Sequence, residues 1–311
     1  MSILWAFPGQ GAQQVGMLRD LPDDPVVREC LAQAALALGE EATTLDTAEA
    51  LQSTRAVQLC LLIAGVASAR LLQAQGCALD YVSGLSIGAY PAAVIAGSLA
   101  FDDALRLVAL RGELMQSAYP QGYGMTAVLG LDLAQVESLI TEVHRPDFPV
   151  YLANINADSQ MVIAGRTDAM TEVARRAKQA GAATCKRLAV SVPSHCALLD
   201  KPAQALADAF AKVRVQPPRI RYLSGSTARP LIKADQLRDD LAFNMCRVVD
   251  WRSTVQTAYE RGVRLQIEMP PGAVLTGLAR KVFEQGTAVA FQGARLDSLV
   301  ALSREEVSRN P

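Results

Sequence analysis

The sequence has few histidines and no excess of charge of either sign. Its 311 residues include only 2 histidines, and 30 lysines and arginines are balanced by 31 aspartates and glutamates, a net charge of -1. This balance argues against nucleic acid as a partner, because proteins that bind it concentrate basic residues against the phosphates. Since 50% of the residues are hydrophobic, the chain can build a large core and one smaller inserted domain.

Several familiar signals are missing as well. The six cysteines lack C-x-x-C spacing, which favours reduced thiols over a disulfide framework or a metal site. The opening MSILWAFPG has neither the basic segment nor the cleavage site of a signal peptide. The longest uncharged apolar stretch, near residues 59–69, is too short to span a bilayer. We therefore expect a cytoplasmic protein with no metal and no membrane partner.

The clearest chemical signal is the sequence GLSIG at residues 84–88, which has the pattern G-x-S-x-G around Ser86. Residues 79–82 before it predict a short strand, and residues 87–96 after it can open a helix. A strand, a tight turn with glycines and a helix form the context of a nucleophile elbow. In such an elbow the backbone N–H of Ile87 and the helix dipole can stabilise an oxyanion. The alternative is a serine in an ordinary strand-to-helix turn.

A second loop of interest follows the apolar strand predicted at residues 3–7. It reads PGQGAQ at residues 8–13 and lacks both the Walker lysine and the G-x-G-x-x-G pattern of phosphate-binding loops. In serine acyl enzymes the second oxyanion donor often comes from such an early strand–loop junction. A glutamine side chain or a backbone N–H of this loop is therefore a candidate donor.

The base that would activate Ser86 can be sought by elimination, because only two histidines are available. His144 lies in the polar loop EVHRPDFP, whereas His195 follows a predicted strand in VSVPSHC. Imidazole is the usual base near neutral pH, and His195 is the better placed of the two. The neighbouring Cys196 is an alternative nucleophile, which we interpret as a packing residue.

One arginine lies on the apolar stripe of a predicted helix over residues 101–119, with Asp102 as its expected N-cap. Arg111 comes three residues after Val108, on that stripe, whereas Arg106 lies on the polar face four residues after Asp102. A cation on an apolar stripe is costly unless it is paired. Arg111 is therefore either a snorkelling or salt-bridged arginine, or one that awaits a ligand carboxylate.

Residues 124–190 change character and predict an inserted small domain. The expected order of strands and helices is βαββαβ, which is typical of the ferredoxin-like unit. Its basic residues could meet an acidic partner, although a surface balanced by nearby acids is the simpler interpretation. On both flanks strands and helices alternate, including a buried helix at residues 54–75, which favours a mostly parallel sheet.

Five motifs taken together resemble the malonyl-CoA:acyl carrier protein transacylases in order and spacing along nearly the whole chain. They are FPGQGAQ at 7–13, GLSIG at 84–88, LRGELMQ at 110–116, VPSHCALL at 192–199 and PPGAVLTGL at 270–278. The resemblance implies an α/β fold with an α/β-hydrolase-like large domain (1–123 and 191–311) and an inserted ferredoxin-like small domain (124–190). It also implies acyl transfer by a serine and a histidine.

The resemblance carries roles for six positions. Ser86 matches the acylated serine and His195 the base, while Gln10 and the N–H of Ile87 match the oxyanion donors. Arg111 matches the arginine that binds the malonyl carboxylate, and Asn244 matches the position whose backbone carbonyl orients the histidine. The implied enzyme binds no cofactor. It moves malonyl from malonyl-CoA, through a malonyl-Ser86 intermediate, to the prosthetic-group thiol of an acyl carrier protein.

Two positions depart from the family pattern and bear on the carrier. Leu85 stands where the family usually has histidine, and Ala89 where it usually has glutamate. The segments at 2–13, 84–94 and 150–165 look most like the transacylase (epsilon) subunit of bacterial malonate decarboxylase. That similarity predicts a carrier with a phosphoribosyl-dephospho-CoA arm and other decarboxylase subunits as partners. The alternatives are the transacylase of fatty acid synthesis, a serine thioesterase and a non-catalytic carrier-docking subunit.

Overall fold

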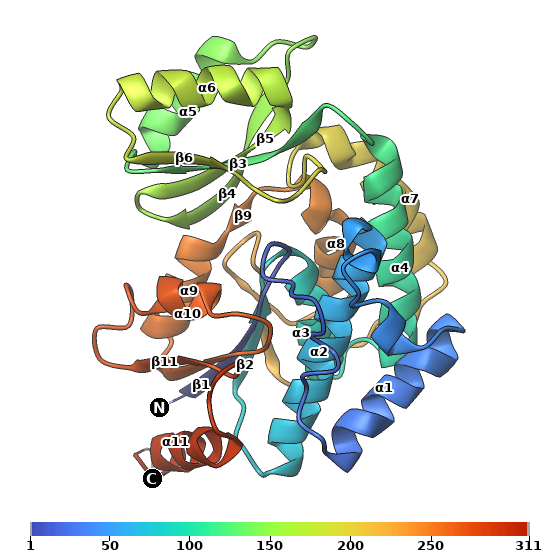
Figure 1. Cartoon of the computed structure of the whole chain (residues 1–311). Helices are drawn as coiled ribbons and strands as arrows, with labels where there is room; N and C mark the ends of the chain where they lie inside the picture. Colours follow the sequence, from blue (N-terminus) through green and yellow to red (C-terminus); the bar gives the residue numbers. More distant parts are fainter. Residues whose placement is uncertain (1, 310–311) are drawn as a thin grey trace.

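The computed structural model describes residues 2–309 and places the chain in two parts, each built on its own sheet (Figure 1). The larger part holds a 6-stranded sheet in the order β11-β10-β1-β2-β7-β8. All neighbouring strands are parallel except β7 and β8. The strands are β1 (Ser2–Phe7), β2 (Tyr81–Gly84), β7 (Arg221–Leu223), β8 (Pro230–Leu231), β10 (Val263–Glu268) and β11 (Thr287–Ala290). The predicted mostly parallel sheet is confirmed.

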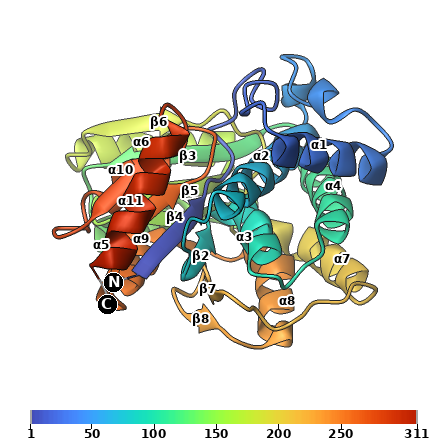
Figure 2. The ribbon, with the colours of Figure 1, turned by 90° about the horizontal axis from the view of Figure 1, so that it is seen from below.

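Helices cover both faces of this sheet, because alternate side chains of its central strand pack into a hydrophobic core on each side. Ile3, Trp5 and Phe7 of β1 pack in the core on one face, whereas Leu4 and Ala6 pack on the other face with the helices at Trp251–Glu260 and Val274–Ala279 (Figure 2). This alternation is the period of two expected of a strand. The helices on the first face include α1 (Pro25–Leu38), α2 (Thr54–Ala74), α3 (Ala89–Ile95), α4 (Phe101–Ala118), α7 (Asp200–Phe210), α8 (Ala234–Phe243) and α11 (Leu296–Ser308); α9 (Trp251–Glu260) and α10 (Val274–Ala279) lie on the other.

Helix α2 runs through the core and is buried nearly all round, as predicted. It is long and apolar enough to cross a membrane by length and composition, but 89% of its apolar window is buried inside the protein. That burial is typical of the core helix of a folded domain. The helix is longer than the uncharged stretch near residues 59–69, because it also includes Arg55 and Arg70.

The smaller part has the predicted order β3 (Tyr123–Leu129), α5 (Leu133–Val143), β4 (Val150–Ala157), β5 (Gln160–Arg166), α6 (Thr167–Gln179) and β6 (Thr184–Arg187). Its strands pair in the order β6-β3-β5-β4-β9, which contains the ferredoxin-like arrangement. Helices α5 and α6 cover the outer face, and the other face is turned toward the larger part (Figure 1). The added strand β9 (Val249–Asp250) comes from the second large segment and pairs in parallel with β4. The exact domain boundaries stay a prediction.

The expected N-cap of α4 is wrong by two residues. The helix is capped by Ala100, whose backbone is extended and whose side chain makes no capping bond, while Asp102 lies in the first turn. The helix starts early because Phe101 is 3% exposed and belongs to the core. Arg106 accordingly pairs with Asp103 at 2.8 Å rather than with Asp102.

Candidate active site

Ser86 lies in a sharp turn between β2 and α3. The turn begins with a short 3-10 segment (Ser86–Gly88), and Ser86 itself has a φ of 57°, in the left-handed region. A Cβ at Gly84 would overlap the backbone of Gly88, and one at Gly88 would overlap the carbonyl of Phe7. Only glycine fits at either position, so the backbone around Ser86 has the strained geometry of a nucleophile elbow.

His195 is held by two backbone groups from the segment after α8. Its N–H donates to the carbonyl of Met245 at 2.7 Å, and its Nδ1 lies 2.7 Å from the carbonyl oxygen of Asn244. Since a carbonyl can only accept, Nδ1 carries the proton and Nε2 is left as the basic nitrogen. Burial, together with the positive charge of Arg111, lowers the pKa of His195 to about 4. The imidazole is therefore neutral at pH 7, the form that a general base requires.

Ser86 and His195 line one cavity of about 400 Å³. Within residues 2–309 no hydrogen bond joins their side chains, and the hydroxyl of Ser86 accepts one from Nη2 of Arg111 at 3.3 Å instead. Catalytic hydrogen bonds in structures without substrate are often long and form only in the complex.

Arg111 is fully buried, and within residues 2–309 its hydrogen bonds go only to neutral acceptors. Nη1 donates to Oε1 of Gln58 at 2.7 Å, and Nη2 donates to Oδ1 of Asn244 at 3.1 Å. Nε has no partner. Among the described residues no carboxylate pairs with this guanidinium, which argues against the salt-bridged and snorkelling alternatives. A buried cation whose partners are neutral can bind an anion beside Ser86.

Gln58, which we did not predict from the sequence, connects two parts of the site. It is fully buried on α2, and its Nε2 donates to Oε1 of Gln10 at 3.2 Å and to the sulfur of Met115 at 3.3 Å. With its bond to Arg111, Gln58 links the guanidinium to the loop after β1. The available signal was a glutamine flanked by apolar residues in the buried part of a mostly apolar helix, because a buried amide needs partners.

The two expected oxyanion donors lie on adjoining segments. The loop after β1 is tied to the elbow by the bond from the N–H of Leu85 to the carbonyl of Phe7, at 3.0 Å. In the described part of the chain, the backbone N–H groups of Gln10 and Ile87 have no acceptor. Gln10 lines the cavity next to Ser86. Both N–H groups are therefore available to a ligand oxygen.

The two other candidates from the sequence, His144 and Cys196, make structural contacts. His144 caps α5, and its Nδ1 lies 2.9 Å from the carbonyl of Val150. The thiol of Cys196 is buried and donates to the carbonyl of Pro193 at 3.4 Å, and burial raises its pKa to about 12. The thiolate that a nucleophile needs is therefore disfavoured, which agrees with a packing role.

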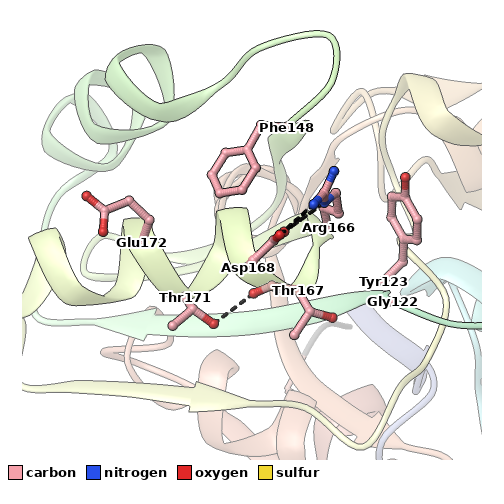
Figure 3. A pocket seen from close by; sticks show the side chains of 8 residues that line it. All are labelled: Gly122, Tyr123, Phe148, Arg166, Thr167, Asp168, Thr171 and Glu172. Carbon is pink, nitrogen blue, oxygen red and sulfur yellow. Dashed lines mark hydrogen bonds and ion pairs between the residues drawn. The ribbon is translucent and has the colours of Figure 1, made fainter.

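A hollow of about 960 Å³ lies on the smaller part between β3 and α6 (Figure 3). Its cation, Arg166, pairs with Asp168 at 2.7 Å, so it is neutralised. Arg175 and Arg176 on the same helix pair with Glu172, at 2.8 and 2.7 Å, as the simpler interpretation expects. Of the other basic residues, Lys186 and Arg187 line the cavity at Ser86.

Comparison with known proteins agrees with this geometry. Residues 4–307 match the acyl transferase domain family. The malonyl CoA-acyl carrier protein transacylase of Escherichia coli K12 is 39% identical over 293 residues, which are 92% of this chain and 94% of that protein. The chain belongs to the malonyl-CoA:acyl carrier protein transacylase family. The Bacillus subtilis transacylase of the same name is 29% identical and covers 99% of both chains.

Solved members of the family share the fold. A malonyl-transacylase in complex with a type II PKS acyl-carrier protein superposes with a TM-score of 0.92 at 36% identity, over 98% of this chain and 100% of that one. The malonyl CoA-acyl carrier protein transacylase of Coxiella burnetii gives 0.91 at 33% identity, over 99% and 98%. The family and the fold class predicted from the sequence are confirmed. The similarity to the malonate decarboxylase subunit stays a hypothesis.

Proposed function

We propose that this transacylase family member transfers malonyl from malonyl-CoA to the thiol of an acyl carrier protein, with malonyl-Ser86 as the intermediate. The observation that carries the proposal is the contact between a buried guanidinium and the serine hydroxyl. Nη2 of Arg111 lies 3.3 Å from Oγ of Ser86, and no internal carboxylate of the described residues occupies it. A malonyl group joins a carboxylate to a thioester carbonyl through one methylene, so both ends can be held at once.

The proposed reaction proceeds in two matching halves. Nε2 of His195 takes the hydroxyl proton as Ser86 attacks the thioester carbon, while the Asn244 carbonyl holds the opposite ring nitrogen. The N–H groups of Gln10 and Ile87 bind the oxyanion, and each such donor contributes about 10²–10³ in rate. The C–S bond then breaks and CoA leaves as a thiol with the proton from His195. The carrier thiol reverses these steps, and no cofactor or metal is required.

Selectivity for malonyl is proposed to come from charge rather than shape. A charge-assisted hydrogen bond stabilises by about 1.5–3 kcal/mol, and loss of one partner of a buried pair costs about 3–5 kcal/mol. The neutral acceptors on Arg111 offset part of that cost for an acyl group without a carboxylate. Fit of a single methylene supplies only about 1–3 kcal/mol. The electrostatic contribution should therefore dominate the choice between malonyl and acetyl.

For the carrier, we propose one that bears phosphopantetheine. The named relatives from E. coli and B. subtilis are malonyl CoA-acyl carrier protein transacylases, and a structural relative was solved with a carrier. The malonate decarboxylase carrier remains a second candidate because Leu85 and Ala89 depart from the family pattern. Leu85 lines the cavity, whereas Ala89 is buried and packs inside. We place the reaction in the cytoplasm.

One experiment tests the activity and the carrier together. The protein is incubated with malonyl-CoA, and the peptide that contains Ser86 is analysed by mass spectrometry, with Ser86→Ala as the control. The acylated protein is then offered two carriers, one with phosphopantetheine and one with the phosphoribosyl-dephospho-CoA arm. An adduct on Ser86 that transfers mainly to the first carrier is expected. Absence of the adduct refutes acyl transfer, and steady release of CoA without any carrier favours the thioesterase.

A further inference from the structure

Tyr90 lies in the first turn of α3, shortly after Ser86, and its side chain is fully buried. Its hydroxyl donates to the carbonyl of Leu241 at 2.9 Å, and the guanidinium of Arg111 lies over its ring, with Cζ 5.8 Å from the ring centroid. One side chain thus links α3 to α4 and to α8, which lie beside it (Figure 2). A buried hydroxyl needs an acceptor, so the hydrogen bond alone would be ordinary packing, but contact with a buried cation is not.

The ring of Tyr90 can hold Arg111 without competing with a substrate. A carboxylate partner would neutralise the guanidinium, and each amide acceptor uses one of its N–H groups. An aromatic ring instead attracts a cation through the charge distribution of its face, which leaves the N–H groups at the edge of the guanidinium to a ligand. Burial raises the pKa of Tyr90 above its ordinary value, so the phenol stays neutral at pH 7. The ring therefore supports the cation and leaves its negative partner to come from the substrate.

The hydroxyl of Tyr90 acts on a different part of the site. Leu241 lies in the last turn of α8, where carbonyl groups lose their partners within the helix. The turn after this helix contains Asn244 and Met245, whose carbonyls hold His195 at 2.7 Å each. A hydrogen bond to the end of α8 therefore fixes the direction in which the chain leaves the helix, and with it the position of both carbonyls.

We propose that Tyr90 positions both the arginine and the base, its ring by contact with Arg111 and its hydroxyl through the end of α8. The inference rests on the proposed function, because it takes Arg111 to bind the malonyl carboxylate and His195 to act as the base. Loss of the ring should weaken recognition of the carboxylate alone. Loss of the hydroxyl should disturb the base and hence affect every acyl group equally. Tyr90 is a positioning residue and takes no part in proton transfer.

The test separates the ring from the hydroxyl. Tyr90→Phe removes only the hydroxyl, whereas Tyr90→Leu and Tyr90→Met remove the ring as well, so that failure of one ring-free variant to fold leaves the other. The control is Tyr259→Phe, on the other face of the large sheet, which removes a hydroxyl that accepts from the N–H of Gln285 at 3.3 Å. Acylation of Ser86 is measured by rapid mixing with malonyl-CoA and with acetyl-CoA, and thermal unfolding checks that each variant is folded.

We expect Tyr90→Phe to lower kcat for both thioesters by the same factor, about 3- to 10-fold, with KM unchanged, as loss of a neutral hydrogen bond implies. The ring-free variants should also lose about 10- to 30-fold in the ratio of kcat/KM for malonyl-CoA to that for acetyl-CoA, as loss of a desolvated cation–π contact implies. An unchanged ratio in a folded ring-free variant, or wild-type kcat in Tyr90→Phe, would overturn the inference. A wild-type protein that never forms malonyl-Ser86 would instead refute the proposed function, so the two failures are distinguishable.

Discussion

Replacement of Gln58 by leucine removes the shortest hydrogen bond of Arg111, from Nη1 to Oε1 at 2.7 Å. A hydrogen bond to a charged group contributes about 1.5–3 kcal/mol. Because Nε already has no hydrogen-bond partner among residues 2–309, the guanidinium would keep only the bonds of Nη2. It should then move within the site, and misplacement of a positioning group by about 1 Å can cost 10²-fold in rate. We expect kcat/KM for malonyl-CoA to fall about 10- to 100-fold.

Acetyl-CoA separates this effect from general damage. The acetyl group makes no bond to Arg111, so its slow acylation of Ser86 should change much less than malonyl transfer. Gln58→Glu should be worse than leucine for malonyl, because the new carboxylate would neutralise Arg111 and compete with the substrate. Gln73→Leu, at an exposed position of the same helix, serves as the control. Rapid-mixing measurements of acylation with both thioesters provide the assay. Equal losses for malonyl and acetyl would refute the assignment of Gln58 as a positioning residue for Arg111.

Three further predictions concern pH and backbone strain. Since the pKa of His195 is lowered to about 4, the acid limb of the pH profile of kcat/KM for acylation should lie well below pH 6.5. A malonyl carboxylate on Arg111 should raise the pKa of His195 in the complex, so the acid limb of kcat should lie at a higher pH. Identical limbs near pH 6.5 would contradict this. Ser86→Gly should abolish acylation yet raise the free energy of unfolding by about 1 kcal/mol, because glycine tolerates a φ of 57°; a lower melting temperature would argue against strain. Burial raises the pKa of Asp240 to about 6, so the folded state binds more protons than the unfolded state between about pH 4 and 6, and its stability should fall as pH rises through that window. Asp240→Asn should remove this dependence of the unfolding free energy on pH, as measured by denaturation curves, and an unchanged dependence would assign it to another group.

Local patterns made part of the site predictable. The turn at Ser86 follows from two glycines whose neighbours approach too closely for a side chain. Arg111 stands out because a cation on an apolar stripe requires an explanation. Elimination between two histidines is enough to choose His195. Its bond to the Asn244 carbonyl could be predicted only from the family resemblance. Each of these inferences uses neighbours in sequence or scarcity of a residue type.

The rest depends on contacts that sequence periodicity does not encode. Gln58 gains its role from partners on α4 and on the loop after β1, which are brought together only by folding. β9 has two residues, too few to give a strand pattern. The cap of α4 shifts to Ala100 because burial of Phe101 outweighs the preference for an acidic cap. The choice of carrier depends on the surfaces of the two proteins, and the motifs near Ser86 do not define it.

The most direct test of charge-based selectivity replaces the guanidinium itself. Arg111→Ala is compared with Arg106→Ala, an exposed arginine of the same helix that pairs with Asp103, and acylation of Ser86 is measured with malonyl-CoA and acetyl-CoA. Loss of a buried charge pair of about 3–5 kcal/mol corresponds to more than 10² in selectivity. We expect Arg111→Ala to lower malonyl transfer by at least that factor while acetyl transfer persists or rises. Equal losses for the two acyl groups, or unchanged malonyl transfer, would contradict it.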